Sequence, residues 1–138
     1  ENNIELALFT PLIAAMGGNV GVQSSAIIVQ ALASQSLGVD NWSKRFFKEL
    51  GVALINGLIC SAIVIFACAW IYPQPYIPII VSLSLLVVMI FAALFGTFVP
   101  LVLNKYRIDP ALATGPFITT MNDVIGLIIY FAIAKIFI

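Results

Sequence analysis

Four long apolar stretches constrain the fold of this chain more than any other feature. They cover about residues 4–34, 43–72, 77–104 and 110–138. Each has or approaches the roughly 20 residues that an α-helix needs to cross about 30 Å of hydrocarbon. Four segments are too few to close a barrel, and open strands would leave backbone groups unpaired in lipid. We therefore predict an all-α fold, a polytopic bundle of four transmembrane helices.

The composition predicts lipid as the surroundings of these helices. Of 138 residues, 62% are hydrophobic and 9% are charged, against roughly 45–50% and about 25% in soluble domains. We expect residues 1–138 to form a single transmembrane domain whose partner is the lipid bilayer. The net charge is zero and the basic residues form no patch on a soluble face, so we expect no nucleic-acid partner.

The basic residues predict the orientation of the bundle. Five of the six Lys and Arg lie in the connecting segments 36–50 and 104–110, which share one side of a four-helix bundle. Positive charge marks the cytoplasmic side. We therefore expect a multi-pass protein of the cell membrane with both basic loops in the cytoplasm and the C-terminus outside. Residue 1 then also faces outward, so we expect a further membrane helix to precede this sequence.

Asp123 is an acid near the middle of the last apolar stretch. It follows Pro110 by thirteen residues and Pro116 by seven, which places it roughly 10–20 Å from the helix end. An ionised carboxylate at this depth costs at least roughly 2.5–3.5 kcal/mol. No basic residue lies centrally in the other stretches, so we expect water or a cation to compensate it. The alternative is a protonated, structural aspartate.

Other polar and small residues are expected on or beside the face of the helix that carries Asp123. This face repeats at i, i+4, i+7 and i+11. Its expected members are Thr119, Gly126 and Tyr130, with Thr120 and Asn122 at its flanks. Pro116 frees a backbone carbonyl one turn earlier. This carbonyl could coordinate an ion or water; the alternative is that Pro116 is only a tolerated kink.

A glycine-rich polar segment interrupts the first apolar stretch. Its residues are Gly17, Gly18, Asn19, Gly21 and Gln23. Glycines allow close approach of helices or a local break, and the two amides, four residues apart, share one helical face. An amide in lipid is unfavourable unless it meets a partner or water. The segment therefore serves helix packing or lines an ion path.

The available ligands are oxygen atoms, which narrows the choice of ion. The chain has no histidine, and its two cysteines lie in an apolar run. Magnesium and calcium take oxygen ligands, and magnesium keeps most of its water. One carboxylate among neutral oxygens suits a hydrated Mg²⁺, and a symmetric homodimer would bring two copies of Asp123 together. These residues do not separate Mg²⁺ from Mn²⁺, Co²⁺ or Ca²⁺, and they leave Na⁺ and K⁺ open.

Two segments resemble the membrane domain of the MgtE family of magnesium channels and transporters. The shared residues are Gly17-Gly18-Asn19-x-Gly21-x-Gln23-Ser24, then Asp109-Pro110-Ala111, Pro116 and Asp123-x-x-Gly126. The resemblance implies a homodimer with five helices per protomer and a pore on the twofold axis, lined by the first and last helices of this chain. It also implies that Asp123 is the central acid and that relatives carry a preceding helix and cytoplasmic regulatory domains. Gly115 departs from the polar residue that some relatives have there, so a side-chain ligand is lost.

We therefore predict inward conduction of hydrated Mg²⁺ past Asp123. Hydrogen bonds to the ion's water would come from Thr119, Thr120 and Asn122. The expected pore-lining or supporting residues are Asn19, Gln23, Gly17, Gly18, Gly21, Pro116 and Gly126. The alternatives are a proton- or sodium-coupled secondary transporter and a non-transporting membrane subunit. No nucleophile–base pair or zinc motif is visible, so we expect no enzyme.

Overall fold

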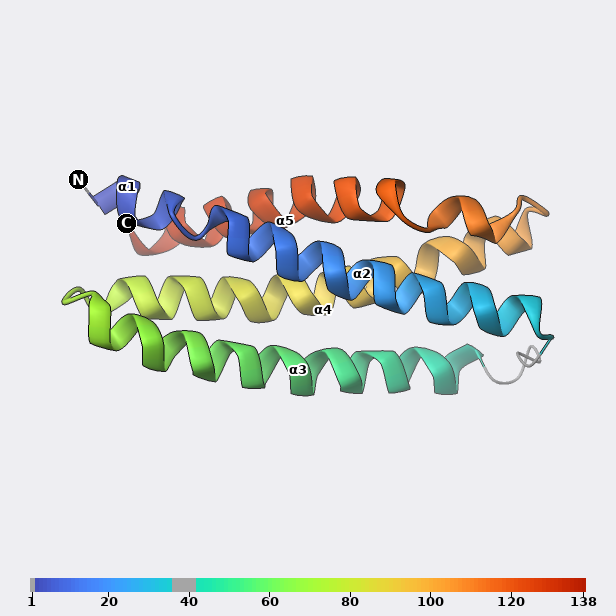
Figure 1. The fold of residues 1–138 in the computed structure, drawn as a ribbon, viewed down its shortest axis with the longest axis horizontal. Coiled ribbons are helices and arrows are strands. Elements are labelled where there is room, and N and C mark those ends of the chain that lie inside the picture. The colour runs from blue at the N-terminus through green and yellow to red at the C-terminus, as the bar shows by residue number, and fades with distance from the viewer. Residues whose placement is uncertain (1, 36–41) are drawn as a thin grey trace.

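The computed structural model describes residues 2–35 and 42–138, which form a bundle of helices (Figure 1). The elements are α1 (Asn2–Ala7), α2 (Thr10–Ala33), α3 (Trp42–Ile71), α4 (Tyr76–Lys105), the 3-10 helix η2 (Pro110–Ala113) and α5 (Pro116–Phe137). Four helical segments are long and apolar enough to cross a membrane: Ile4–Ala33, Trp42–Ile71, Tyr76–Lys105 and Pro110–Phe137. The predicted fold class, an all-α bundle with four membrane helices, is confirmed.

The first membrane segment contains a turn between two helices. α1 ends at Ala7 and α2 begins at Thr10, where the sequence predicted one helix over 4–34. Pro11 occupies the first turn of α2, a position at which its missing N–H leaves no helical hydrogen bond unmade. The hydroxyl of Thr10 donates a hydrogen bond to the Ala7 carbonyl at 2.8 Å, which closes the turn.

The last membrane segment is also divided, and glycine is the reason. η2 begins at Pro110, α5 begins at Pro116, and Gly115 between them has a φ of 63°. This left-handed conformation is accessible to glycine without strain. Pro100, in contrast, lies inside α4, which continues past it to Lys105. The membrane helix after Gly115 is therefore shorter than the predicted range of 110–138.

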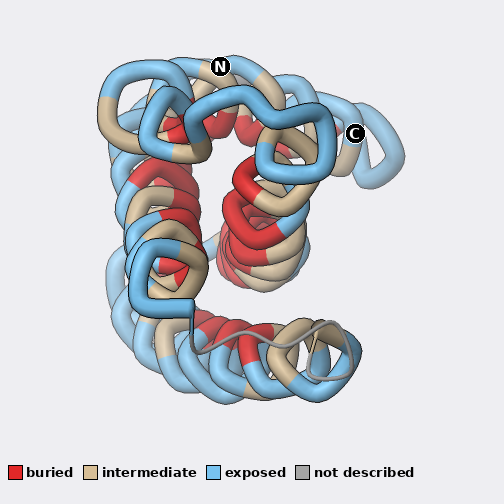
Figure 2. The backbone as a smooth tube through the Cα atoms, turned by 90° about the vertical axis from the view of Figure 1, so that its right-hand side faces the viewer, coloured by how far each residue is buried: buried red, intermediate tan, exposed pale blue. Residues whose placement is uncertain are grey.

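α4 is the central helix of the bundle. It packs against α2, α3 and α5, whereas α3 packs extensively against α4 alone among the described elements. The core joins Leu85, Val88 and Met89 of α4 to Ile13 of α2 and Tyr130 of α5. Buried residues face inward and exposed residues face outward (Figure 2). The outer surface carries many large apolar side chains, which suits a surround of lipid.

The ends of the helices agree with the predicted pairing of loops. Both chain ends and the turn between α3 and α4 lie at one end of the bundle (Figure 1). The C-terminal end of α2, the start of α3 and the segment from α4 to α5 lie at the other, as the shared side of the two basic loops requires. Residues 36–41 of the first loop lie outside the described residues, and 42–50 form the first turns of α3. The cytoplasmic assignment of this end stays a prediction.

Replacing Tyr130 by Phe tests the packing of α5 against α1. The Tyr130 hydroxyl is buried and donates a hydrogen bond to the Leu6 carbonyl at 2.7 Å. Its removal leaves that carbonyl with the Phe9 N–H, at 3.1 Å, as its remaining partner. We therefore expect the loss of one net hydrogen bond, about 1 kcal/mol, and a fall of a few degrees in the unfolding temperature. Thermal unfolding of the detergent-solubilised protein measures it. Tyr106→Phe is the control because Tyr106 is 70% exposed. Equal unfolding temperatures for Tyr130→Phe and the unchanged chain would contradict this role.

Candidate ion site

The site depends on a close crossing between α2 and α4. A Cβ atom at Gly96 would overlap the backbone carbonyl of Gly21, and a Cβ at Gly21 would overlap the side-chain amide of Asn122. Small residues at such crossings let membrane helices approach closely. The sequence identified Gly21 through its polar surroundings, whereas Gly96 had no signal beyond its small size in an apolar helix. The crossing holds α2 between α4 and α5.

Asp123 lies on α5 directly over the backbone of α2 at Gly18. A Cβ at Gly18 would lie 3.0 Å from Oδ1 of Asp123 and 3.2 Å from the methyl carbon of Thr119. Asp123 is half-buried, so its carboxylate remains partly accessible. The structure therefore brings together three of the predicted site residues, Gly18, Thr119 and Asp123.

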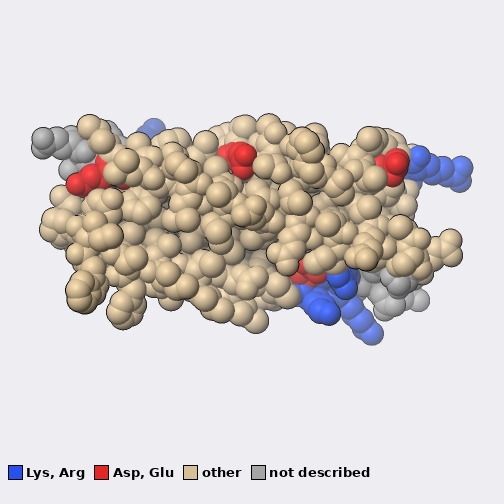
Figure 3. All heavy atoms as spheres, in the orientation of Figure 1, with Lys and Arg blue, Asp and Glu red and all other residues tan. Residues whose placement is uncertain are grey.

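No basic side chain of the described residues pairs with the carboxylate of Asp123. Among residues 2–35 and 42–138, the one ion pair joins Arg45 to Glu49, and no hydrogen bond reaches Asp123. The visible face carries a small group of acidic atoms near its middle, with no basic atoms beside it (Figure 3). The described residues also contain no cluster of three or more His, Cys, Asp or Glu. A cation at this site would meet one carboxylate from each chain.

The neighbouring polar residues of α5 point in different directions. Thr119 is half-buried, and its hydroxyl donates a hydrogen bond to the Gly115 carbonyl at 3.1 Å, so its oxygen remains free to accept one. Thr120 is exposed. Asn122 is 1% exposed and its side-chain nitrogen and oxygen have no hydrogen-bond partner among the described residues. It faces Gly21 rather than the accessible side of Asp123, because neighbouring residues on a helix point about 100° apart.

Part of the α5 face that the sequence expected beside the ion path is buried. Gly126 and Tyr130, which the sequence placed on the face of Asp123, are both buried. A Cβ at Gly126 would lie 3.1 Å from a methyl carbon of Val88, and one at Gly17 would lie 2.9 Å from the same methyl carbon. Both glycines therefore allow α4 to pack closely against α2 and α5. Asp123 lies at the border of this packed face.

The two amides of α2 lie on its outer side. Asn19 and Gln23 are exposed, whereas the three glycines of the same segment are buried. The helix thus has a packed glycine face and an open amide face. Gln23 also lines a pocket between α2 and α3, a location that the sequence did not predict.

A hydrogen bond from α2 holds the segment that precedes α5. The hydroxyl of Ser25 in α2 donates a hydrogen bond to the Ala113 carbonyl at 2.5 Å, and both residues are buried. The Gly115 carbonyl accepts a hydrogen bond from the Thr119 amide at 3.0 Å. Pro116, which opens α5, is exposed. Ser24 and Ser25 continue the polar segment that begins at Gly17, but the sequence assigned no role to Ser25.

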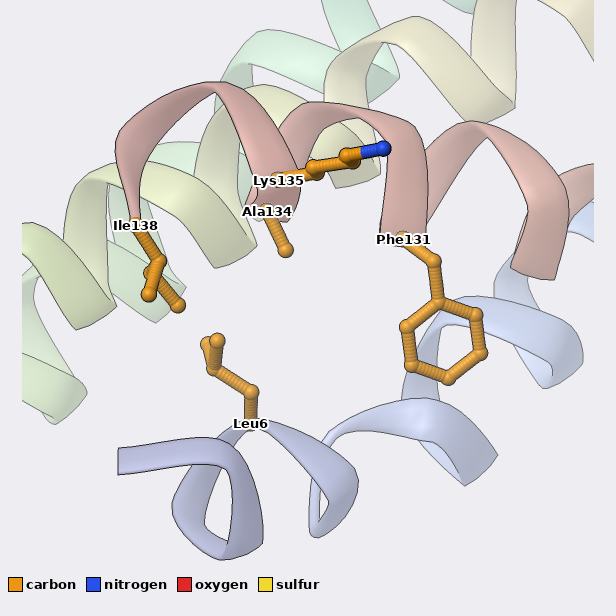
Figure 4. Close-up of a pocket in the computed structure, with 5 residues that line it drawn as sticks. All are labelled: Leu6, Phe131, Ala134, Lys135 and Ile138. Atoms are coloured by element: carbon orange, nitrogen blue, oxygen red, sulfur yellow. The ribbon is translucent and has the colours of Figure 1, made fainter. Parts of the chain in front are cut away.

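A second cavity lies far from Asp123 along the bundle. It has a volume of about 300 Å³ and is lined by Leu6, Phe131, Ala134, Lys135 and Ile138. Figure 4 shows the Lys135 side chain extended along its edge while the other four side chains are apolar. A lone cation among apolar groups offers no ligand to a metal ion. This cavity therefore offers no alternative to Asp123 as a candidate ion site.

Known proteins are similar to this chain over most of its length. Residues 10–133 match the family model MgtE, described as a divalent cation transporter. Proteins named magnesium transporter MgtE from Thermus thermophilus, Bacillus subtilis and Enterococcus faecalis are 37%, 33% and 34% identical. These matches cover 95%, 98% and 96% of this chain but only 29%, 30% and 29% of those proteins. The chain thus spans less than a third of the relatives' length.

Substituting Gly96 by Ala tests the helix crossing beneath the site. The added methyl group would meet the Gly21 backbone, which cannot rotate away, so we expect a loss of at least about 1–3 kcal/mol. Gly51→Ala is a matched control, since nothing lies within 4 Å of a Cβ there and alanine favours a helix by about 0.5–1 kcal/mol. Thermal unfolding in detergent should show a lower unfolding temperature for Gly96→Ala and a higher one for Gly51→Ala than for the unchanged chain. A Gly96→Ala chain as stable as the unchanged one would refute the crossing.

Proposed function

Because the chain belongs to the MgtE family of divalent cation transporters, we propose that its membrane helices conduct hydrated Mg²⁺ past Asp123. We propose magnesium as the ion because the relatives are named magnesium transporters. A single carboxylate accompanied by threonine hydroxyls suits magnesium, which binds through few carboxylates and keeps several waters.

One observation carries this proposal: a partly accessible carboxylate near mid-membrane has no protein partner among the described residues. Ionisable groups at such depth face a cavity, a partner or an ion pathway. A divalent cation about 4 Å away would gain about 2 kcal/mol from one carboxylate even at the dielectric constant of bulk water. The gain rises as water is excluded, so a single acid suffices to concentrate the ion.

Thr119 and Thr120, in the turn before Asp123 on α5, carry hydroxyls and are not fully buried. Their oxygens can accept hydrogen bonds from water molecules that are bound to Mg²⁺. Asn122 faces Gly21 in this arrangement, so we assign it to the contact between α5 and α2. This modifies the expectation that Asn122 holds the ion's water directly.

The proposed assembly is a homodimer with the ion path on its twofold axis. One carboxylate balances half of a divalent charge, and two copies of Asp123 would balance all of it. Asn19 and Gln23 are exposed at membrane depth, where amides need a partner or water. A second copy or a water-filled path beside α2 would supply both. With the basic ends in the cytoplasm, the membrane potential would draw Mg²⁺ inward by about 2.3 kcal/mol per charge per 100 mV.

Replacing Asp123 by Asn tests the acid directly. We expect Mg²⁺ flux into liposomes to fall at least about tenfold, since the lost attraction exceeds about 1.4 kcal/mol. Asp123→Glu keeps the charge and should retain more flux than Asn. Asp109→Asn is the control, because Asp109 is an acid at the helix end whose Oδ1 accepts the Ala111 amide at 2.9 Å, and asparagine can do the same.

The same assay distinguishes the alternative functions. Conduction predicts flux that is driven by a potassium-diffusion potential without any proton or sodium gradient. Flux that requires such a gradient would establish a coupled transporter instead. Normal flux in Asp123→Asn would contradict the proposal. An absence of transport by the unchanged chain, together with lost assembly in Asp123→Asn, would also contradict it and would indicate a non-transporting subunit.

Gly18→Ala tests whether the position of the carboxylate matters. A methyl group there would lie 3.0 Å from Asp123 Oδ1, so the carboxylate must move by a few tenths of an ångström. Because misplacement of a binding group is costly to function, we expect a several-fold fall in flux with little change in unfolding temperature. Gly51→Ala should leave the flux unchanged. Equal flux in both variants would show that the carboxylate tolerates displacement.

A further inference from the structure

A polar pocket lies between α2 and α3 at the basic end of the bundle. It has a volume of about 260 Å³, which is room for roughly eight water molecules at about 30 Å³ each. Its polar lining consists of Gln23 and Ser24 from α2, and Arg45, Lys48, Glu49 and Asn56 from α3. The pocket exists because α3 packs extensively against α4 only, which leaves its side toward α2 incompletely covered.

The charges of this pocket leave a positive excess. Glu49 is 6% exposed and pairs with Arg45, whose Nε lies 3.4 Å from its Oε1. Lys48 makes no ion pair with any described residue. The Arg45 Nε is shielded from solvent and makes no hydrogen bond within the described chain, and the guanidinium has four further N–H donors. An anionic ligand would therefore meet two cations and one carboxylate that is already paired.

The pocket joins a basic helix end to an apolar surface. Arg45 and Lys48 lie in the first two turns of α3, whose start shares an end of the bundle with Lys105. Further along the same helix, Val52, Ile55 and Ile59 are exposed. A ligand with a negative headgroup and apolar tails would contact both the basic pocket and the apolar surface of α3. A free anion would contact only the basic pocket.

We propose that this pocket binds the headgroup of an acidic phospholipid. The phosphate would accept hydrogen bonds from Arg45 and Lys48, the amide of Asn56 would meet the polar part of the headgroup, and the acyl chains would lie along α3. Basic pockets between membrane helices recognise anionic headgroups in this way. The volume accommodates a headgroup and leaves the acyl chains outside. The inference rests on the membrane helices and is independent of the proposed ion path.

Native mass spectrometry of the detergent-solubilised protein tests this site. Phosphatidylglycerol or phosphatidylcholine is added at equal concentration, and the fraction of chains that retain one lipid is compared. We expect phosphatidylglycerol to be retained preferentially. Lys48→Gln should lower its affinity about fivefold, which corresponds to the contribution of about 1 kcal/mol from one basic residue near a membrane surface. This variant keeps the Arg45–Glu49 pair intact, so the fold is not put at risk.

Lys105→Gln is the matched control, because Lys105 is a basic residue at the same end of the bundle and does not line this pocket. It should retain the lipid as the unchanged chain does. An equal loss in both variants would indicate general attraction to the basic end and overturn the proposal. Displacement of phosphatidylglycerol by excess inorganic phosphate would identify a free-anion site instead. Equal retention of the two lipids, or exclusion of lipid by a second copy of the chain, would also overturn it.

Discussion

The contact between the backbones of α2 and α4 at Gly21 and Gly96 sets the rest of the structure. Membrane helices gain little from the hydrophobic effect when they associate, so close packing and hydrogen bonds must hold them together. The crossing brings Gly18 beneath Asp123 and places the side chain of Asn122 against Gly21. Ser25 then ties α2 to the segment that starts α5. One close approach therefore determines where the acid lies.

The position of Asp123 follows from a compromise between packing and accessibility. The fully buried positions of α5 include Asn122, Gly126 and Tyr130, and an ionised group there would lose its water. Asp123 is one residue away from Asn122 and lies at the border of the packed face. It rests on a glycine backbone that lets the two helices approach, while its oxygens remain partly accessible. A larger residue at position 18 would force the carboxylate away from α2.

The sequence was sufficient for the fold class because the length of an apolar run alone limits what a chain can do in lipid. It also identified Asp123 and Gly18, since an acid and a glycine cluster are unusual inside such runs. It could not predict that Asn122, Gly126 and Tyr130 are buried while Asp123 is partly accessible, because small and polar residues pack membrane helices and also line pathways. The packing role of Gly96 could not be predicted for a related reason: it depends on which helix crosses it. The sequence also did not predict the burial of Glu49, which pairs with Arg45 four residues earlier and is spaced with Ala53 and Gly57 along α3.

The two faces of α2 connect the fold to the proposed function. In a soluble helix the amides would face water and the glycines would weaken the helix, but in lipid both acquire other uses. The buried glycines permit the crossings with α4 and α5, while Asn19 and Gln23 remain on the open side. Because hydrocarbon offers no hydrogen-bond partner, that open side requires a second protein surface or water. Asp123 lies over Gly18, the residue next to Asn19, so water or a partner that satisfies the Asn19 amide would also lie near the acid. A hydrated path on the proposed dimer axis would meet both requirements with one arrangement.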